Sequence, residues 1–456
     1  MKSFSSVVLI LVMSNLVLAD KQPNILFIVG DDMGYADVGF HGCKDIPTPS
    51  LDALASSGVR FSRGYVSGPY CSPTRAGLLT GRYQQRFGHE FNPGGGGDGL
   101  PVTETTIANR LKAAGYATGI VGKWHLGAQP AMQPQQRGFD EFFGFLSGAH
   151  SYFSSATILR GTEPVPEIDY TTDAFGREAV SFIDRHKSHP WFLYLAFNAV
   201  HTPMHATDDR LAKFSSIEDK TRRTYNAMML AMDEAIGNVR KKLADSGLEQ
   251  NTMIMFISDN GGPTMPGVTI NGSRNEPLRG SKRTTLEGGI RVPFMIAWPG
   301  HLKPSVYSQP AIQLDLNATA LAAAGIEAKP DWHLDGVNLL PYLSGEKSGS
   351  PHAALYWRFG TQMAIIQGDL KLVRYDGNVE RKSNDEAKQG LSEAKLYRLS
   401  EDIGEADNLA TKEPGLMKEL QAKWDVWNAT LVKPLWGAGK GDSDESKTKS
   451  RSKKLK

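Results

Sequence analysis

Acidic side chains follow two short apolar runs of the sequence. Asp31 and Asp32 come directly after one run, and Asp259 and Asn260 come directly after another. Two adjacent carboxylates at the end of a buried strand raise each other's pKa, and a hard divalent cation relieves this by taking oxygen ligands from several loops. Because these four positions offer oxygen donors and neither His nor Cys, they indicate Ca²⁺ or Mg²⁺ and not zinc. The structural alternative is that Asp31 caps a helix and Asp259 begins a turn.

A second unusual segment covers residues 71–82 and reads C-S-P-T-R-A-G-L-L-T-G-R. A buried cysteine is often no more than a small hydrophobic side chain. That interpretation fits Cys71 poorly, because Pro73 and Arg75 lie beside it. Cys43 has no such neighbours, and we expect it to be a free buried thiol.

Residues 71–82 resemble the signature of the formylglycine-dependent (type I) sulfatases, C-x-P-x-R followed by T-G-R. In that family the cysteine is oxidised to formylglycine, and the hydrate of formylglycine is the nucleophile. The resemblance therefore implies that a formylglycine-generating or sulfatase-maturing enzyme converts Cys71. Thr74 stands where many members have Ser, a variant that leaves Cys71, Pro73 and Arg75 in place.

Further landmarks of this family follow in order over residues 22–430. The run from residue 23 into Asp31-Asp32 resembles the opening strand and its metal ligands, and residues 258–261 (S-D-N-G) resemble the second ligand pair. Residues 122–127 (G-K-W-H-L-G) resemble the loop whose Lys and His contact the formylglycine and the sulfate. The implied ligands of one Ca²⁺, with Mg²⁺ as the second choice, are Asp31, Asp32, Cys71, Asp259 and Asn260.

The family's mechanism assigns a role to each remaining position. His201 occupies the place of the leaving-group histidine and protonates the alcohol oxygen with help from Lys282, the sulfate-binding lysine. His125 takes a proton from the formylglycine hydrate, so that sulfate leaves. Cations are needed because a sulfate ester spreads negative charge over its oxygens. Arg75 and Lys123 hold the geometry of the nucleophile and offset its charge. The implied catalytic residues are Cys71, Arg75, Lys123, His125, His201 and Lys282.

The substrate is only weakly encoded. Residues 85–89 (Q-R-F-G-H) resemble carbohydrate sulfatases of polysaccharide-degrading bacteria. A sulfated galactan such as carrageenan is therefore the first expectation, and a host glycosaminoglycan is the second. His89 is a candidate sugar contact, with a structural loop histidine as the alternative, and Ser147 is a candidate sulfate contact.

Two other functions compete with sulfate ester hydrolysis. A phosphodiesterase or phosphonate monoester hydrolase of the same alkaline phosphatase-like superfamily is the first, but enzymes with two transition metals need further His and Asp ligands. The second is a non-catalytic protein that binds sulfated glycans and never oxidises Cys71. The intact Cys71, Pro73 and Arg75 argue against it.

The elements that position these residues follow from the pattern of apolar runs. Short runs alternate with helical stretches, which is typical of a parallel sheet with helices on both faces, and ligands bind beyond the carboxyl ends of such strands. The predicted strands are residues 24–29, 59–65, 117–121, 191–197, 253–258 and 294–298. The predicted helices are residues 49–57, 106–114, 172–185, 221–244 and 314–324.

The pattern changes near residue 350. Strands are predicted at 354–358, 363–367 and 371–375, the last two joined as a hairpin, and a helix at 413–428. We therefore expect an alkaline phosphatase-like α/β fold, with a large mixed, mostly parallel sheet sandwiched by helices over residues 20–348. A smaller α+β subdomain is expected over residues 349–436.

Composition and targeting signals set the remaining limits. The chain has 456 residues, of which 40% are hydrophobic and 22% charged, so disorder is excluded as the main state. Lys2, an apolar run and small residues before position 20 predict a signal peptide over residues 1–19. No later stretch approaches the about 18 apolar residues of a membrane span. We therefore expect an exported protein, periplasmic or extracellular, without a transmembrane anchor.

Charge is concentrated at the C-terminus. Residues 437–456 hold seven basic and three acidic residues, and without them and Lys2 the chain has 43 basic against 46 acidic residues. This balance argues against nucleic-acid binding by the body of the protein. We expect the basic tail to be a disordered, solvated end, with a weak anchor for an anionic polymer as the alternative.

Overall fold

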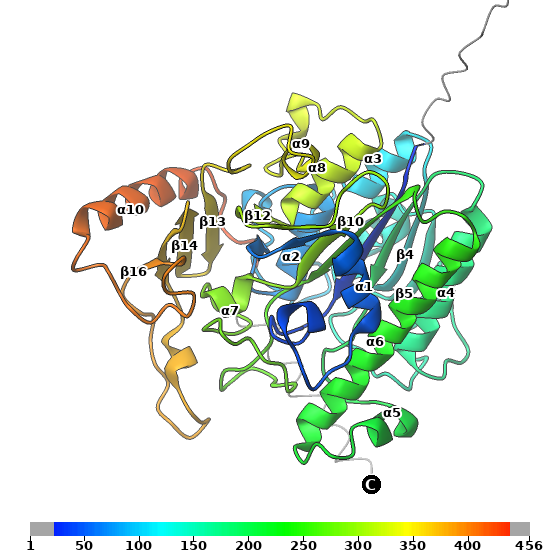
Figure 1. Ribbon diagram of the computed structural model, residues 1–456, viewed down its shortest axis with the longest axis horizontal. Coiled ribbons are helices and arrows are strands. Elements are labelled where there is room, and N and C mark those ends of the chain that lie inside the picture. Colours follow the sequence, from blue (N-terminus) through cyan, green and yellow to red (C-terminus); the bar gives the residue numbers. More distant parts are fainter. Residues whose placement is uncertain (1–21, 438–456) are drawn as a thin grey trace, which may run out of the picture.

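The computed structural model describes residues 22–437. The predicted signal peptide, and the predicted basic tail from residue 438 onward, lie outside the described residues. Figure 1 shows a large sheet in the middle of the molecule and, to its left, a small sheet beside helix α10 (Pro414–Asn428). Between residues 22 and 437, none of the helices has both the length and the hydrophobicity to cross a bilayer.

Ten strands form the large sheet, and its central strands β9, β1, β8, β4 and β5 are all parallel to one another. Strand β10 and strands β6 and β7 add antiparallel pairs on the two sides, so the sheet is mixed and mostly parallel, as predicted. In spatial order the strands are β11 (Ser305–Tyr307), β2 (Val59–Phe61), β10 (Phe294–Ala297), β9 (Thr252–Ser258), β1 (Asn24–Gly30), β8 (Trp191–Ala196), β4 (Ala117–Lys123), β5 (Glu141–Phe145), β6 (Leu159–Arg160) and β7 (Glu163–Pro164).

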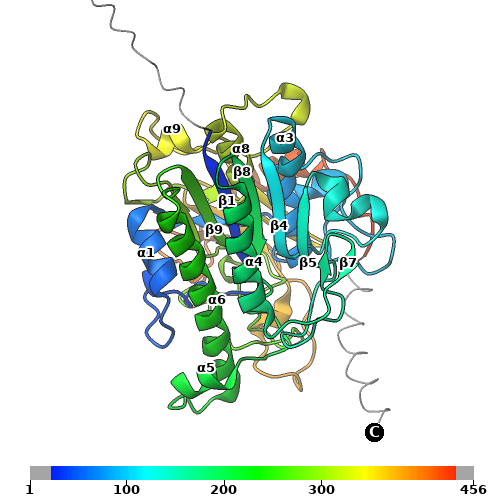
Figure 2. The same ribbon diagram turned by 90° about the vertical axis from the view of Figure 1, so that its right-hand side faces the viewer.

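Helices cover both faces of this sheet. Leu26 and Ile28 of β1 pack into one core, whereas Ile25, Phe27 and Val29 pack into the other, because successive side chains of a strand point to opposite faces. Figure 2 shows α4 and α6 side by side over the first face. The first face is covered by α1 (Pro49–Ser57), α4 (Thr171–His186) and α6 (Lys220–Asp245), and the second by α2 (Cys71–Thr80), α3 (Ile107–Ala113) and α8 (Leu314–Ala323).

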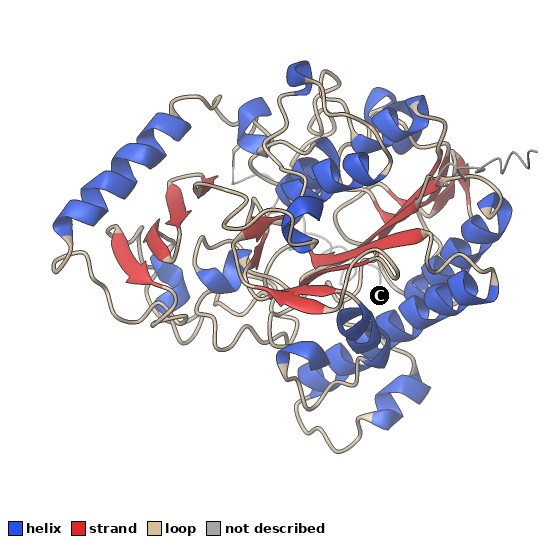
Figure 3. Cartoon of the chain, turned by 45° about the horizontal axis from the view of Figure 1, so that its top comes forward, coloured by secondary structure: helices blue, strands red, loops and turns tan. Residues whose placement is uncertain are grey.

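The C-terminal part is a separate antiparallel sheet (Figure 3). Its strands are β13 (Leu355–Phe359), β14 (Gln362–Gln367), β15 (Leu370–Arg374) and β16 (Lys395–Arg398). The Trp357 indole nitrogen donates to the Val66 carbonyl oxygen at 2.7 Å, which ties this sheet to the larger part of the chain. The predicted hairpin of β14 and β15 is confirmed, whereas β16 was not predicted. The boundary at residue 348 stays a prediction.

Two local predictions were wrong or incomplete. Residues 59–65 are not one strand, because a turn at Ser62 and Arg63 separates β2 from β3 (Gly64–Tyr65). A Cβ atom on Gly64 would lie 2.3 Å from the Phe294 Cβ, so only glycine fits this close approach. Helix α2 was not predicted, although it ends at Gly81 with φ 74°, a common helix terminus. The remaining short elements are β12 (Ala311–Ile312), which pairs with β3, α5 (Asp208–Lys213), α7 (Glu287–Ile290) and α9 (Leu340–Leu343).

A histidine–carboxylate pair fastens the segment that leads from the large sheet to the small one. His352 Nε2 lies 2.8 Å from Asp315 Oδ1, and the Asp315 side chain is completely buried. Burial lowers the pKa of His352, but the Asp315 carboxylate outweighs it, so that the pKa rises above 6.5. The stability that this pair contributes is therefore fully present below pH 6.5 and is lost as pH rises through the folded-state pKa.

We predict that His352→Gln lowers the free energy of unfolding by about 1.5–3 kcal/mol in acid and by less in alkali. Urea denaturation of the variant and the wild type at about pH 5.5 and about pH 9 measures this difference. His189 is exposed and serves as the matched control, so His189→Gln should follow the wild type at both pH values. A loss that is equal at both pH values would contradict the assignment.

Candidate active site

The predicted functional side chains meet at the carboxyl ends of the central strands. Gly30 of β1 pairs in register with Ser258 of β9, so Asp31-Asp32 and Asp259-Asn260 begin side by side. The histidines follow the neighbouring strands: His201 lies after β8 and His125 after β4. Cys71 is the first residue of α2 and is 1% exposed.

Three carboxylates and a thiol form a compact buried cluster. Asp31, Asp32, Cys71 and Asp259 each offer one ligand atom, and these atoms all lie within 4.8 Å of one another. Asp31 Oδ1 and Asn260 Oδ1 are buried and accept no hydrogen bond from the described residues. An unsatisfied buried acceptor costs about 1–3 kcal/mol. Oxygen atoms of this kind are the ligands that Ca²⁺ and Mg²⁺ take, so the residues fit a divalent cation.

A cationic side chain from a different element faces each carboxylate. Arg75 of α2 donates through Nε and Nη2 to Asp259 Oδ2, at 3.0 and 2.8 Å. At the end of β4, Lys123 Nζ lies 2.5 Å from Asp31 Oδ2.

The third cation is Lys282, whose Nζ lies 2.8 Å from Asp32 Oδ2. Three carboxylates therefore face three cations, and the set is close to neutral. A divalent cation added to this set would leave it with about two positive charges, which favours the binding of an anion.

The acidic groups differ in pKa although they lie together. Burial raises the pKa of Asp32, but Lys282 and His201 outweigh burial and lower it to about 2. Burial and then the Asp31 carboxylate raise the pKa of Asp259 to about 6. Burial raises the pKa of the Cys71 thiol well above its usual value. Repulsion from the neighbouring Asp31 carboxylate therefore contributes to the raised pKa of Asp259.

Two buried histidines accompany the cluster, and their surroundings differ. His201 Nδ1 lies 2.6 Å from the Thr202 carbonyl oxygen, which only accepts, so Nδ1 carries a hydrogen. Its Nε2 lies 3.6 Å from Asp32 Oδ2 and is the atom that can exchange a proton within the site. Burial and then Lys123 lower the pKa of His125 well below its usual value, so its imidazole is neutral.

Among the described residues, His89 and Ser147 have no hydrogen bond to the three carboxylates. His89 is completely buried, and its Nε2 lies 2.6 Å from the hydroxyl of Ser72, the residue after Cys71. Ser147 is exposed and donates its hydroxyl to the Ala149 carbonyl oxygen at 3.0 Å. Substrate contact by either residue stays a prediction.

Three further buried residues support the site. Tyr194 of β8 accepts from Arg75 Nη1 at 3.3 Å. The Asn271 side chain donates to the backbone oxygen of Asp32 at 3.1 Å, and the Tyr152 hydroxyl lies 2.8 Å from the His201 backbone oxygen. Tyr152 and Tyr194 look like ordinary core residues in the sequence, and nothing in the sequence around Asn271 connects it with Asp32.

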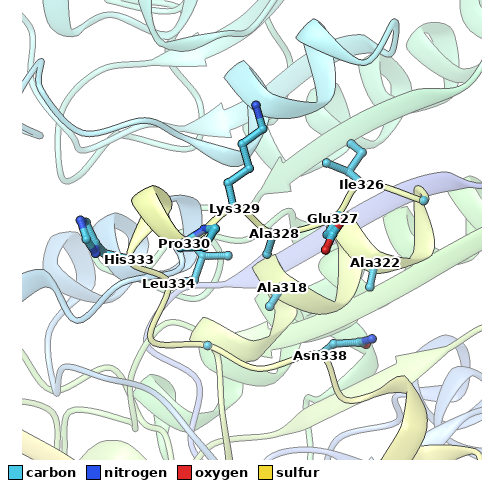
Figure 4. Close-up of a pocket in the computed structure, with 12 residues that line it drawn as sticks. Ala318, Ala322, Ile326, Glu327, Ala328, Lys329, Pro330, His333, Leu334 and Asn338 are labelled. Carbon is cyan, nitrogen blue, oxygen red and sulfur yellow. The ribbon is translucent and has the colours of Figure 1, made fainter.

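A large hollow lies elsewhere, beside α8. It has a volume of about 610 Å³ and is lined mainly by small and apolar residues (Figure 4). Lys329 and Glu327 are its charged members, and none of the predicted site residues lines it. Its lining has no cluster of acidic or basic side chains, so the cluster around Cys71 is the better candidate for the active site.

Several known proteins are similar to this chain over most of its length. Human N-acetylgalactosamine-6-sulfatase is 36% identical over 382 residues, which cover 77% of this chain and 72% of the human protein. The Escherichia coli (strain K12) protein described as uncharacterized sulfatase YdeN is 31% identical, and the match covers 88% of this chain and 84% of that protein. The solved structure of Ps i-CgsB in complex with k-i-k-neocarrahexaose is 35% identical with a TM-score of 0.84, covering 94% of this chain and 98% of that one.

These similarities confirm the alkaline phosphatase-like fold and favour sulfate ester hydrolysis over the phosphoester, phosphonate and glycan-binding alternatives. The model of the family described as Sulfatase matches residues 23–326, about two thirds of the chain. The chain belongs to the sulfatase family and is a sulfuric ester hydrolase.

Proposed function

We propose that this sulfatase removes sulfate from a carrageenan-type galactan, with formylglycine formed from Cys71 and Ca²⁺ bound by Asp31, Asp32, Asp259 and Asn260. The observation that carries the proposal is the meeting of Cys71 with three buried carboxylates, whose ligand atoms lie within 4.8 Å of one another. Carboxylate and amide oxygens suit Ca²⁺. Mg²⁺ is the less favoured ion.

The choice of substrate rests on the relative that was solved in complex with k-i-k-neocarrahexaose, which covers nearly the whole chain at 35% identity. The similarity to N-acetylgalactosamine-6-sulfatase makes a glycosaminoglycan the second proposal. A sulfated oligosaccharide carries its anionic ester into a site where Arg75, Lys123 and Lys282 already face the carboxylates. The attraction between these cationic side chains and the negatively charged sulfate ester steers the substrate toward the site.

In the proposed mechanism, formylglycine and Ca²⁺ together supply a nucleophilic oxygen and neutralise charge on the sulfate. Lys123 forms an ion pair with Asp31, and Lys282 forms one with Asp32. From these positions the two lysines stabilise negative charge on the sulfate oxygens. His201 donates a proton from Nε2 to the leaving sugar oxygen. The neutral imidazole of His125 takes up a proton when sulfate is released. Arg75 holds Asp259 in place through two hydrogen bonds.

We also propose that the chain is exported, with residues 1–19 as its signal peptide, and that a formylglycine-generating or sulfatase-maturing enzyme acts on it. The support for export is the N-terminal pattern of a basic residue, an apolar run and small residues.

The first test concerns Cys71 and the substrate together. The wild type should release sulfate from carrageenan-type oligosaccharides in a panel of defined sulfated sugars, and peptide mass should show residue 71 to be lighter than cysteine. Cys71→Ala should release none while remaining folded, because the change removes only the terminal atoms of one short side chain. Cys43→Ala is the matched control and should retain activity. An active Cys71→Ala protein would contradict the proposed role of Cys71. Sulfate release from glycosaminoglycans alone would contradict the carrageenan-type substrate and favour a glycosaminoglycan.

The second test concerns the metal. Elemental analysis of the active enzyme should find about one Ca²⁺ per chain. A chelator should lower the melting temperature, because a ligand that binds only the folded state stabilises it, by about 2.7 kcal/mol at a hundredfold excess over Kd. Asp31→Asn should lose the ion and this response to the chelator, whereas Asp407→Asn, at an exposed carboxylate, should keep both. Activity without any divalent ion would exclude the assignment.

The third test concerns His201. Sugar alcohols leave poorly without a proton, whereas nitrophenolate hardly needs one, so acid catalysis worth about 10²–10⁴-fold applies mainly to sugar sulfates. We expect His201→Ala to lose turnover of a sugar sulfate much more than turnover of p-nitrophenyl sulfate. His125→Ala should lose both to the same degree, because His125 acts when sulfate is released from any substrate. Equal losses in His201→Ala would assign the acid role to Lys282 or to water.

A further inference from the structure

Lys282 lies in a tight turn that belongs to no strand of the large sheet. The turn follows a long segment after β9 and closes with a hydrogen bond from Thr284 N to the Ser281 carbonyl oxygen at 3.0 Å. Arg283 has φ 73°, in the left-handed region, which is strained for a residue with a side chain. Such a conformation persists only where surrounding contacts hold it. The position of Lys282 therefore depends on what packs against its turn.

One side chain of the small sheet holds this turn from both sides. Gln362, the first residue of β14, donates from Nε2 to the Arg283 carbonyl oxygen at 2.8 Å. Its Oε1 accepts from the Thr285 backbone nitrogen at 3.2 Å. Gln362 is 7% exposed, so water does not compete freely for these bonds. A single amide group thus fixes the backbone on each side of Thr284, directly after Lys282.

A buried ion cluster fixes the far end of the same segment. Glu405 Oε2 accepts from the backbone nitrogen of Glu287, the first residue of α7, at 2.8 Å. Lys371 Nζ of β15 lies 2.8 Å from Glu287 Oε1 and 2.8 Å from Glu405 Oε1, and all three side chains are completely buried. The removal of one partner from a buried ion pair is strongly destabilising, so this cluster is an anchor and a poor target for mutation.

We propose that Gln362 is a positioning residue of the sulfate site and that the small C-terminal sheet works in catalysis by placing Lys282. The inference rests on the proposed sulfate-binding role of Lys282. A lysine side chain is long and flexible, so its backbone must be fixed for Nζ to stay near Asp32 and the sulfate. Gln362 reaches no reacting atom and acts only through the turn.

A double-mutant cycle tests this inference. Gln362→Leu, Lys282→Ala and the double variant are compared by kcat/KM on the sulfated oligosaccharide that the wild type desulfates. Because a displacement near 1 Å can cost up to about 10²-fold, we expect Gln362→Leu to lose about 10–10²-fold. The same change made in the Lys282→Ala protein should cost little more, because Gln362 then has no lysine to position.

The matched control is Gln367→Leu. Gln367 lies at the other end of β14, and its Oε1 accepts from Lys423 Nζ of α10 at 2.7 Å, so it has no bond to the Lys282 turn. The Gln367→Leu variant should therefore keep a kcat/KM near the wild-type value. Gln362→Glu keeps the oxygen that accepts from the Thr285 nitrogen. It replaces the donor to the Arg283 carbonyl oxygen with a second oxygen, so that hydrogen bond is lost. This variant should also be impaired, and it replaces Gln362→Leu in the cycle if the leucine variant does not fold.

The outcomes separate the inference from the function on which it rests. A Lys282→Ala protein as active as the wild type would remove the sulfate-binding role of Lys282. An impaired Lys282→Ala protein together with a fully active Gln362→Leu protein would overturn only the positioning role. Losses that multiply in the double variant would make Gln362 a general structural residue and would overturn the inference as well. Where Lys282→Ala has no measurable turnover, Lys282→Gln, which removes the positive charge but keeps a polar side chain, takes its place in the cycle.

Discussion

Repulsion between three buried carboxylates governs the architecture of this protein. Asp31, Asp32 and Asp259 are almost completely buried and lie close enough to share a ligand sphere. In a medium of low dielectric constant such charges are tolerated only when they are paired. The three cations that pair with them come from α2, from the end of β4 and from the turn before α7. These elements must meet at one point for the fold to be stable.

The parallel sheet is the means by which they meet. Strands β9, β1, β8 and β4 are neighbours and point in the same direction, so the loops after them lie along one edge. Helices cover both faces and exclude water from the strands, which makes the edge a region of low dielectric constant. The small sheet adds a further support for the turn that carries Lys282, through the side chain of Gln362. Catalysis and stability therefore depend on the same contacts.

Much of this arrangement could be predicted from the sequence, for physical reasons that also mark the limit. Central strands such as β1 and β9 read as unbroken apolar runs because both of their faces are buried. Helix α2 gave no such signal: all ten of its residues are buried, and they include Ser72, Thr74 and Arg75, so it has no polar face to set a helical period. Motifs located Cys71, Lys123, His125 and Lys282 along the chain. The two hydrogen bonds from Gln362 to the Lys282 turn could not be predicted from the sequence, because they depend on how the small sheet packs against the rest of the chain.

The pairs that neutralise the buried acids join distant parts of the chain. Asp32 and Lys282 are 250 positions apart, and Arg75 and Asp259 are 184 apart. Contacts of such long range close late, after the entropy of large loops has been lost. While a ribosome is still making the second half of the chain, β1 already ends in two carboxylates whose partners are incomplete, and α2 has no completed sheet to pack against. In the finished molecule Cys71 is 1% exposed. The residues around this cysteine are therefore accessible to another macromolecule only before the chain has folded.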